Sequence, residues 1–402
     1  MTHQNGLPKN WKMVKLGEVC EIIMGQSPPS STYNTAEIGL PFFQGKAEFT
    51  ELHPIVEKWC RAPNKIAEPN DILLSVRAPV GATNVADQKC CIGRGLAAIR
   101  YENYKYIFYF LRSIERNLDE KGTGTTFRAI SGETIRETDF PLPPLPIQHR
   151  IIAKIEELFS ELDKGIENLK TAQQQLKTYR QAVLKWAFEG KLTNSKVNGE
   201  LPKGWEIKKL SELSVYVSDG DHLPPPKSEK GIPFITISNI NNNEIDFSDT
   251  MFMTEKYYED LKENRKPIKG DVLYSVTGSF GIPVLINFEK KFCFQRHIGL
   301  IRPLKTTNQK WLYYLLQSPQ IFSQARKTAT GTAQKTVALK SLRNFEIPFC
   351  SPSEQAKIVQ EIESRLSVCD KTEETITASL QQAEALRQSI LKRAFEGRLV
   401  GG

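Results

Sequence analysis

Residues 148–190 form a run of 43 residues with the apolar spacing of a helix and no proline. Two rows of mostly apolar residues recur in it every seven residues: Ile155, Leu162, Leu169, Leu176 and Val183 in one row, and Leu158, Gly165, Ala172, Tyr179 and Trp186 in the other. A heptad pattern sustained over five repeats predicts a helix that packs along a partner helix. At 1.5 Å per residue this helix is roughly 60 Å long, far longer than most globular helices.

A partner for this helix is present in the same chain, because residues 355–399 repeat residues 148–192. The two segments are identical at 19 of 45 positions, which include Gln148/Gln355, Asp163/Asp370 and Arg180/Arg387. In the second copy one heptad row consists of Ile362, Cys369, Ile376, Ala383 and Ile390, and the other is interrupted by Arg365, Thr372, Ser379 and Arg393. The linker 191–200 is short and polar, so the second globular domain begins at the far end of the first helix. We therefore expect the second helix to return antiparallel to the first.

The repeat extends through the rest of the chain. LPKNWKMVKL at 7–16 matches LPKGWEIKKL at 201–210, NDILLSVRAPVG at 70–81 matches GDVLYSVTGSFG at 270–281, and 122–145 parallels 329–352. An internal duplication of this kind predicts two copies of one structural unit. We expect a first globular domain at 1–147, a first long helix at 148–190, a linker at 191–200, a second globular domain at 201–353 and a second long helix at 354–399.

The globular parts read as mixed α/β (α+β) domains. DILLSV, GLAAIRY, DVLYSV and HIGLIRP are short, apolar and bounded by turn residues, which predicts strands, whereas 104–118 and 309–326 have helical periodicity. The prolines at 141–146 predict a stiff, extended segment between the first globular domain and the first long helix. This segment should neither continue a strand nor begin a helix before Pro146. Gly190 and Gly397 follow the last apolar turn of each long helix and suit a left-handed helix cap.

Composition narrows the class of protein. A chain of 402 residues exceeds what one hydrophobic core serves, and its 40% hydrophobic and 25% charged residues are ordinary for a soluble protein. The N-terminal sequence lacks the apolar core of a signal peptide, so we expect a cytoplasmic protein. The seven cysteines include no C-x-x-C pair and read as reduced, mostly buried thiols. A net charge of +8 favours anionic partners, although only weakly.

Motifs for catalysis are missing from the sequence. There is no phosphate-binding loop, dinucleotide fingerprint, H-E-x-x-H or G-x-S-x-G motif, and the five histidines are scattered. No set of His, Cys and acidic residues has metal-ligand spacing. The sequence therefore indicates a binding protein without a metal or cofactor of its own.

The duplicated architecture closely resembles the specificity subunit of type I restriction-modification enzymes over essentially the whole chain. The marks of the resemblance are the Gly-Thr turns at 124–125 and 331–332, the helix-opening Gln148 and Gln355, and the AFEG[KR]L endings of both helices. The segment FCSP at 349–352 departs from the PLPPL pattern of the first copy.

The resemblance implies a subunit without catalytic activity that reads a bipartite double-stranded DNA target. Each globular domain would be a target-recognition domain for one half-site, and the two helices, as an antiparallel intramolecular coiled coil with pseudo-twofold symmetry, would set the unread spacer. Two methylation subunits, which carry the S-adenosylmethionine site and methylate adenine, and the restriction and translocation subunits would assemble on this scaffold. No membrane partner is expected.

Candidate DNA-reading residues are polar or basic side chains in segments that follow strands, because such side chains contact base edges and phosphates. In the first domain these are Gln26, Ser27, Gln44, Lys46, Arg77, Arg94, Thr125, Thr126 and Arg128. In the second domain they are Asp219, His222, Lys227, Thr236, Asn239, Thr277, Ser279, Arg296, His297, Thr332, Gln334 and Lys335. Lys185, Lys392 and Arg393, near the AFEG endings, are candidate contacts for a partner subunit.

Other interpretations of the same residues stay open. Arg77 or Arg94 could pair with an acidic neighbour, the histidines could be structural, and a long amphipathic helix is more often structural than a docking surface. An alternative function is a coiled-coil protein-interaction scaffold without sequence-specific DNA binding. An enzyme with an unrecognised site is the third hypothesis.

Overall fold

The chain folds into two compact units. The computed structural model describes residues 7–124, 128–193, 200–220, 227–332 and 334–400. Unit 1 comprises residues 1–170 and 377–402, and unit 2 comprises residues 171–376. This division differs from the expected boundaries because each unit includes parts of both long helices, which pack on its globular portion.

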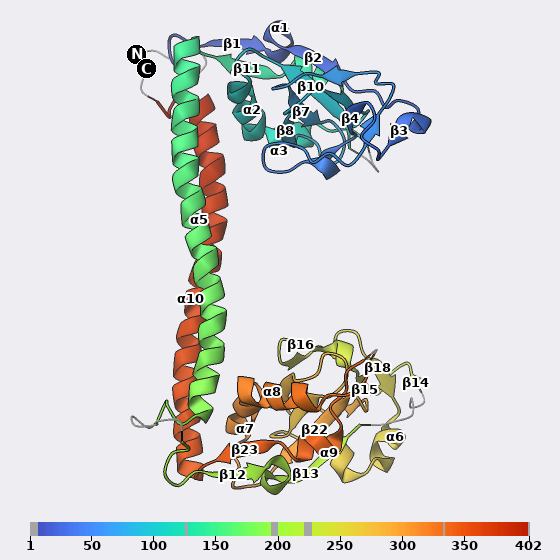
Figure 1. Cartoon of the computed structure of the whole chain (residues 1–402), viewed down its shortest axis with the longest axis vertical. Helices are drawn as coiled ribbons and strands as arrows, with labels where there is room; N and C mark the ends of the chain where they lie inside the picture. The colour runs from blue at the N-terminus through green and yellow to red at the C-terminus, as the bar shows by residue number, and fades with distance from the viewer. Residues whose placement is uncertain (1–6, 125–127, 194–199, 221–226, 333, 401–402) are drawn as a thin grey trace. The chain divides into compact units, whose positions relative to one another are not determined.

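The two long helices are α5, Leu145–Phe188, and α10, Pro352–Phe395, drawn green and red in Figure 1. Helix α5 begins three residues before the expected Gln148 and contains Pro146 in its first turn, where no backbone N–H is needed. Both helices end in a Schellman motif: the Lys191 N–H donates to Trp186 O (2.8 Å) and the Arg398 N–H to Arg393 O (2.8 Å). The glycines at the caps, Gly190 and Gly397, have φ values of 75° and 71°, so the expected left-handed caps are confirmed.

Each unit contains a stretch in which α5 and α10 run antiparallel. In unit 1, Arg387 of α10 pairs with Asp163 of α5. In unit 2, the Arg180 guanidinium of α5 is 2.7 Å from Asp370 and 2.9 Å from Glu373 of α10. The heptad row of α10 is buried at every position: Ile362, Cys369, Ile376, Ala383 and Ile390.

Two expected seam positions of α5, Gly165 and Trp186, are exposed. Trp186 is 36% exposed, whereas the neighbouring Val183, Leu184 and Ala187 are buried. The end of α5 turns this other face into the core of the unit 2 globule, where Ala187 and Phe188 pack with Trp311. Burial against the globule therefore overrides the heptad pattern at this end.

Unit 1 contains two larger sheets. The first is antiparallel, in the order β2-β10-β7-β8, and is formed by β2 (Glu21–Met24), β7 (Ile72–Ser75), β8 (Thr83–Val85) and β10 (Leu96–Arg100). The second has the order β3-β5-β4-β9-β6 and is formed by β3 (Tyr33–Asn34), β4 (Leu40–Phe43), β5 (Trp59–Cys60), β6 (Ile66–Ala67) and β9 (Cys90–Ile92). Strands β4 and β9 are parallel.

The buried strand β7 separates two hydrophobic clusters. Successive side chains of a strand point to opposite faces, so Leu73 packs with Phe43 and Ile92, whereas Ile72 and Leu74 face the helices. This explains why DILLSV is apolar without alternation. The strand is covered on both faces.

Four short α-helices and a two-stranded pair complete the described part of the unit 1 globule. The helices are α1 (Leu16–Val19), α2 (Tyr104–Ser113), α3 (Glu115–Glu120) and α4 (Gly132–Arg136), and the strands are β1 (Lys12–Lys15) and β11 (Asp139–Leu142). The single helix expected over 104–118 is interrupted at Ile114. Pro141, which was expected to exclude a strand, lies in β11, where it faces Met13 of β1. A two-stranded pair has free edges, and proline is tolerated there because no N–H is required.

Unit 2 repeats this plan. Its antiparallel sheet has the order β13-β22-β19-β20, with β13 (Ser214–Asp219), β19 (Val272–Ser275), β20 (Pro283–Leu285) and β22 (Ile298–Pro303). The sheet β14-β18-β15-β21 contains β14 (Lys227–Ser228), β15 (Ile232–Ile235), β18 (Met251–Met253) and β21 (Cys293–Phe294), and β15 and β21 are parallel. The small pairs are β12 (Glu206–Lys209) with β23 (Glu346–Phe349) and β16 (Ile240–Asn241) with β17 (Glu244–Ile245).

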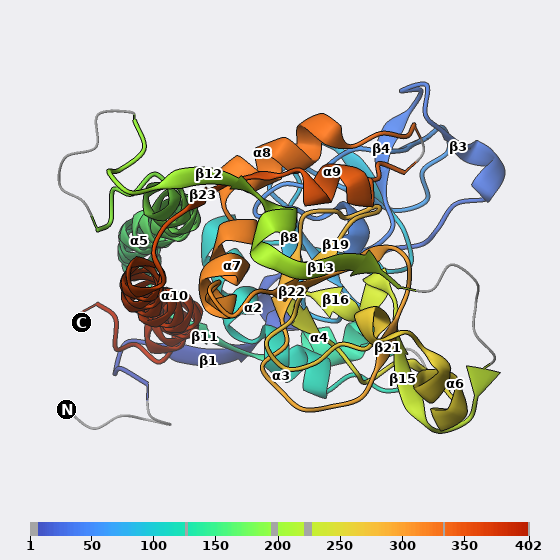
Figure 2. The same ribbon diagram turned by 90° about the horizontal axis from the view of Figure 1, so that it is seen from below.

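The helices of unit 2 also follow the repeat. They are α6 (Glu255–Asp260), α7 (Gln309–Leu316), α8 (Pro319–Thr328) and α9 (Leu339–Arg343). The expected helix over 309–326 is divided at Ser318, whose hydroxyl caps α8 by accepting from the Ile321 N–H. Figure 2 shows α8 and α9 beside each other in this unit.

The repeated LPK-x-W segments dock on the repeated helix ends. A Cβ placed on Gly397 would lie 2.4 Å from Pro8 and 3.5 Å from Trp11. A Cβ on Gly190 would lie 2.1 Å from Pro202. The glycine of each AFEG ending is thus required both by its positive φ and by the proline that packs on it.

Candidate nucleic-acid interface

Three loops of unit 1 meet at one end of the two sheets. The Gln26 N–H donates to Ile92 O (3.1 Å), the Gly93 N–H to Phe43 O (2.8 Å) and the Gly25 N–H to Leu96 O (2.9 Å). These bonds join the loops that follow β2 and β4 to the loop between β9 and β10. The parallel pairing of β4 and β9 explains the convergence, because the carboxyl ends of both strands lie at the same edge.

The convergence brings predicted reading residues together. Gln26, Gln44 and Arg94 are exposed. The Ser27 hydroxyl accepts a hydrogen bond from the Arg94 N–H (3.1 Å), and a Cβ on Gly95 would lie 2.2 Å from Gln44 O. Ser27 is therefore a positioning residue for the loop that carries Arg94. Lys46 is exposed in the short 3-10 helix Lys46–Glu48 after Gln44.

A fourth and a fifth segment join this cluster through backbone bonds. The Val76 N–H donates to Gly95 O (2.9 Å), and the Ala78 N–H donates to Arg128 O (3.0 Å). Arg77, between them, is exposed. The Arg128 guanidinium is 3.5 Å from an Asp119 carboxylate oxygen, an ion pair that the sequence did not predict. Thr125 and Thr126 lie outside the described residues.

Unit 2 repeats the same hydrogen-bond scheme with different side chains. The Gln295 N–H donates to Ile235 O (2.9 Å), the Val276 N–H to His297 O (2.9 Å) and the Gly278 N–H to Lys335 O (3.0 Å). The loops after β15 and β19, the loop between β21 and β22 and the segment 330–336 are thereby joined. The residues on these loops that the sequence predicted and that are exposed or half-buried are Thr236, Ser279, Arg296, His297, Thr332, Gln334 and Lys335.

Several predicted residues have structural roles instead. Asn239 is 7% exposed, and its amide accepts from the Thr236 backbone and donates to Asp246 O and Asp249 O, so it stabilises its own loop. Thr277 is 8% exposed, and its hydroxyl accepts from that of Thr336 (3.2 Å). Both side chains position the loops, which does not favour base contact by either.

The remaining predicted residues of unit 2 are spread out. Asp219 is half-buried at the end of β13, 3.6 Å from the Arg265 guanidinium. Lys227 is exposed in β14 and pairs through its backbone with Met253 of β18. His222 lies outside the described residues.

The imidazole of His297 is the one predicted reading group with a resolved pKa shift among the described residues. Burial, and then the neighbouring Arg296 cation, lower its pKa below the ordinary value of 6.5. At neutral pH His297 is therefore uncharged, with one donor and one acceptor nitrogen.

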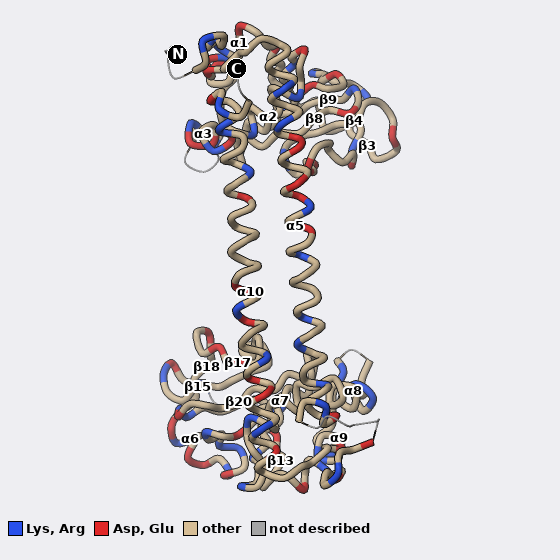
Figure 3. The backbone as a smooth tube through the Cα atoms, turned by 90° about the vertical axis from the view of Figure 1, so that its left-hand side faces the viewer, with Lys and Arg blue, Asp and Glu red and all other residues tan. Residues whose placement is uncertain are grey.

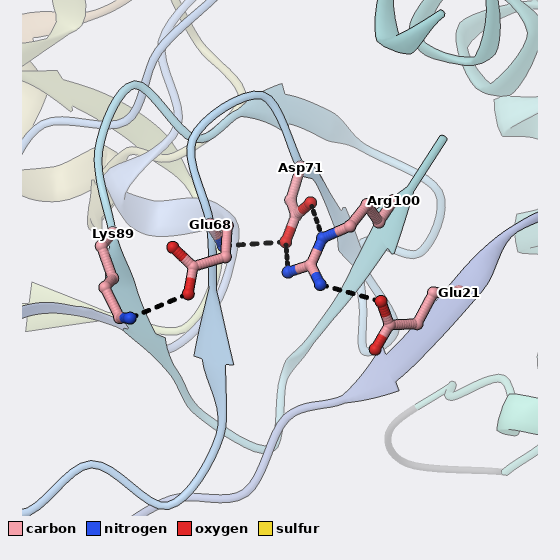
Figure 4. A network of polar contacts seen from close by, with 5 residues as sticks. All are labelled: Glu21, Glu68, Asp71, Lys89 and Arg100. Carbon is pink, nitrogen blue, oxygen red and sulfur yellow. Dashed lines mark hydrogen bonds and ion pairs between the residues drawn. The ribbon is translucent and has the colours of Figure 1, made fainter. Parts of the chain in front are cut away.

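The sequence did not predict an Asp–Arg ion pair that each unit has at the end of its sheet opposite the loop cluster. We call this ion pair the clamp. The Arg100 guanidinium donates to both oxygens of the buried Asp71 (2.8 Å each), and the Glu68 N–H donates to the same carboxylate (2.8 Å) (Figure 4). This hydrogen bonding raises the pKa of Arg100. A signal was present: an Asp before one strand and an Arg at the end of another recur in both copies.

The second copy of this clamp is closely similar. The Arg302 guanidinium donates to both oxygens of Asp271 at 2.8 and 2.7 Å, and the Ile268 N–H donates to Asp271 (2.9 Å). In each unit the clamp fixes the register of the two antiparallel strands that carry reading loops at their other ends. It is a positioning device and does not face the loops.

The candidate docking residues Lys185, Lys392 and Arg393 are all exposed on the last turns of α5 and α10. Lys185 and Lys392 lie 3.9 Å from Glu189 and Glu396, their neighbours one turn on. These are weak surface pairs that leave the lysines available.

The described part of the chain contains no group of three or more His, Cys, Asp or Glu residues that could hold a metal ion. All seven cysteines are free and buried, as expected. Among the described residues, no helix is both long and apolar enough to span a membrane.

The model for the type I restriction modification DNA specificity domain matches the chain twice, at residues 8–176 and 202–382. The chain belongs to the type I restriction-modification DNA specificity family. Each of the two matches contains one of the two loop clusters.

Relatives named as specificity subunits resemble either nearly the whole chain or about half of it. The EcoBI specificity subunit of Escherichia coli is 25% identical over 421 residues, covering 97% of this chain and 86% of that protein. A putative MjaX specificity subunit of Methanocaldococcus jannaschii is 38% identical over 192 residues, which is 46% of this chain and 44% of that protein. The chain thus matches less than half of that relative's length.

Solved structures of the family share the fold. A chain from a study of complex assembly and conformational transition of the type I restriction-modification system superposes with a TM-score of 0.72 at 22% identity and covers 98% of this chain and 99% of that chain. The HsdS subunit from Thermoanaerobacter tengcongensis gives a TM-score of 0.61, also at 22% identity, and covers 98% of both chains. The mixed α/β class expected from the sequence is confirmed.

Proposed function

We propose that this chain is the non-catalytic DNA-sequence-recognition subunit of a type I restriction-modification enzyme, and that it binds a bipartite, asymmetric target in double-stranded DNA. The observation that carries this proposal is the duplicated loop cluster. One backbone hydrogen-bond scheme holds the loops in both units, but the side chains on them differ. A shared scaffold with different reading side chains fits two different half-sites.

The differences fall at matched positions of the two clusters. Arg77 of the first cluster corresponds to Thr277, and Gln44 corresponds to Thr236, whereas Arg94 corresponds to Arg296. An arginine can bind guanine through two hydrogen bonds in the major groove, and a glutamine can bind adenine in the same way. Exchanging such residues changes the base that is preferred, while the backbone scheme keeps the loops in place.

Reading requires loops that are held before DNA arrives. The Ser27 hydroxyl on the Arg94 backbone and the Asn239 amide in its own loop supply this order in the two units. Rigid loops lose little conformational entropy on binding, so more of the contact energy is left for discrimination between bases.

The organisation we propose follows the repeat. Residues 1–147 and 201–353 form the two target-recognition domains, and 148–190 and 354–399 form an antiparallel intramolecular coiled coil joined through the linker 191–200. The antiparallel contacts in each unit support this arrangement. A pseudo-twofold axis would then relate the two halves, and the coiled coil would set the length of the unread spacer.

The partners we propose are two methylation subunits and the restriction and translocation subunits. The adenine methylation chemistry and the S-adenosylmethionine site would belong to the methylation subunits, since the specificity subunit carries no cofactor in this proposal. Exposed Lys185, Lys392 and Arg393 beside the helix ends are the proposed docking contacts. We propose a cytoplasmic location for the complex.

Replacement of one domain tests the proposal. Residues 201–353 are exchanged for the corresponding segment of a family member with a different target, and the chain is expressed with its methylation subunit. Sequencing of methylated DNA should show one half-site changed and the other retained. A motif that changes in both halves, or in neither, would contradict the assignment of one half-site to each domain.

A further inference from the structure

The segments that contain the predicted reading residues Arg128 and Lys335 carry opposite net charges in the two units. In the alignment of the two copies that matches Gln148 with Gln355, Asp119 corresponds to Arg326, Glu120 to Lys327 and Glu133 to Lys340. Residues 326–345 contain five basic residues and no acidic residue, whereas residues 119–138 contain three basic and four acidic residues. The duplicated scaffold is therefore anionic at these positions in unit 1 and cationic in unit 2.

The ion pairs of the two segments differ accordingly. In unit 1, Arg128 lies 3.5 Å from Asp119, and Arg116 lies 3.0 Å from Glu120. The matched residues of Arg128 and Asp119 in unit 2 are Lys335 and Arg326, so two cations stand where unit 1 has an ion pair. The basic stripe, defined as Arg326, Lys327, Lys335 and Lys340, is exposed, and none of its four cations has a carboxylate partner among the described residues.

The basic stripe is joined to the reading loops of unit 2. Lys335 O accepts from the Gly278 N–H in the loop after β19, and Phe280 of that loop stacks on Phe322 with ring centroids 5.9 Å apart. Phe322 lies one helical turn before Arg326 on α8. Figure 3 shows Lys and Arg on α8 and α9, in contrast to the mixed signs around α3.

Arg343, the fifth basic residue of the segment, is already used. Its guanidinium donates two hydrogen bonds to Val217 O, at 3.1 and 2.6 Å, and so anchors α9 to β13. The anchored helix holds Lys340 at the surface. Exposed cations held next to reading loops, without carboxylates to neutralise them, are suited to contact the phosphates of a DNA backbone.

We propose that the basic stripe binds DNA phosphates beside the second half-site, and that unit 1 has no equivalent at the three reversed positions. Electrostatic, sequence-independent affinity is then concentrated on the second target-recognition domain. This inference rests on the proposed DNA-reading function and adds a division of labour within it. The second domain supplies phosphate affinity, and both domains supply base discrimination.

A reciprocal exchange of charges tests the inference. One variant receives the unit 1 residues in unit 2, Arg326→Asp, Lys327→Glu and Lys340→Glu. The other receives the unit 2 residues in unit 1, Asp119→Arg, Glu120→Lys and Glu133→Lys. Each is purified with its methylation subunit, and binding to target and non-target duplexes is measured by fluorescence anisotropy over a range of salt concentrations.

A matched control removes as much charge elsewhere in unit 2: Lys256→Glu, Lys262→Glu and Lys305→Glu. These lysines are exposed. Lys305 and Lys262 lie toward the clamp end of the sheet, since Lys305 follows β22 and Lys262 lies next to the 3-10 helix Glu263–Arg265, whose Glu263 O accepts from Tyr216, and Lys256 lies on α6. The control therefore separates a local phosphate contact from the effect of net charge.

Each released phosphate contact changes the slope of log affinity against log salt by about 0.9. The unit 2 variant should lose about 2 to 3 from the magnitude of the slope on both duplexes, the unit 1 variant should gain a similar amount, and the control should change little. The methylated motif should stay the same in all three.

Four results would overturn the inference. The first is an unchanged slope in the unit 2 variant, and the second is an equal loss of slope in the control. The third is a changed second half-site, which would make the stripe a base reader. The fourth is failed assembly with the methylation subunit at unchanged slope, which would make the stripe a protein-docking surface. Failure of the proposed function is distinct, because the unmodified complex would then show no preference for target over non-target DNA.

Discussion

The Arg180 guanidinium on α5 lies 2.7 Å from the Asp370 carboxylate on α10. In the repeat, Arg180 corresponds to Arg387 and Asp370 corresponds to Asp163. Arg387 and Asp163 also pair with each other. Each arginine thus binds the aspartate of the other copy. Reciprocal pairing of this kind supports the proposed antiparallel coiled coil, because each ion pair shows which residues of the two helices face each other within its unit.

This pairing leads to a prediction for the helices as a spacer. Seven residues inserted into α5 between Asp163 and Arg180, and seven into α10 between Asp370 and Arg387, preserve the heptad register and both ion pairs. At 1.5 Å per residue the insertion adds about 10 Å, the rise of about three base pairs. Methylome sequencing should show a longer unread spacer with both half-sites unchanged.

The control is an insertion in α5 alone, which displaces Arg180 from Asp370 and should destabilise the complex. Changed half-sites in the double insertion, or an unchanged spacer, would count against the spacer role of the helices.

The glycines of the long helices should respond in opposite directions to alanine. Gly190 has a φ of 75°, and a Cβ there would lie 2.1 Å from Pro202, so Gly190→Ala should lower the free energy of unfolding by at least about 1 to 2 kcal/mol. Gly165 lies within α5 and a Cβ on it would meet nothing within 4 Å, so Gly165→Ala should raise it by about 0.5 to 1 kcal/mol. Urea unfolding checks both, and equal effects would refute the cap assignment.

The two buried clamps should differ in strength. The Arg302 side chain is 19% exposed and that of Arg100 is 38% exposed, whereas both aspartates are buried. Loss of a charged hydrogen-bond partner costs about 1.5 to 3 kcal/mol, and more where the remaining charge is less hydrated. We expect Asp271→Asn to destabilise its unit more than Asp71→Asn. The exposed pair of Lys89 and Glu68 in Figure 4 is the control, and Lys89→Gln should cost less than about 1 kcal/mol in urea unfolding.

The imidazole of His297 gives a pH prediction. Its folded pKa lies below 6.5, so the unfolded chain binds a proton more readily as the pH falls. The contribution of His297 to stability is therefore fully present above pH 6.5 and is lost as the pH falls towards the folded pKa. Nuclear magnetic resonance titration should give a pKa below 6.5, and because burial is the larger cause, Arg296→Gln should restore only part of the shift. A pKa at or above 6.5 in the unmodified protein would contradict this account.

Much of the fold could be predicted from the sequence because the chain contains it twice. The heptad rows and the shared AFEG ending identified both long helices, and the buried runs around Leu73 and Leu273 identified the central strands. The ends were less accurate: the sequence did not show that Pro141 lies on a free strand edge, or that the end of α5 turns Trp186 outwards. Those outcomes depend on tertiary contacts with residues distant in the sequence.

The candidate site was predicted in part. Position after a strand was enough to predict that Gln26, Gln44, Arg94 and Arg296 lie on converging loops, because strand ends meet at one edge of each sheet. It could not distinguish an exposed reader from a loop-positioning side chain, so Ser27 and Asn239 were included. That distinction depends on hydrogen bonds to backbone atoms, which residue type alone does not reveal.

The most direct measurement of the central claim is methylome sequencing of a host that expresses this chain with its methylation subunit. Our account predicts one split motif with methylated adenine, in which two different short half-sites flank a fixed number of unspecified bases. A continuous motif, or no motif although the methylation subunit is active, would contradict it.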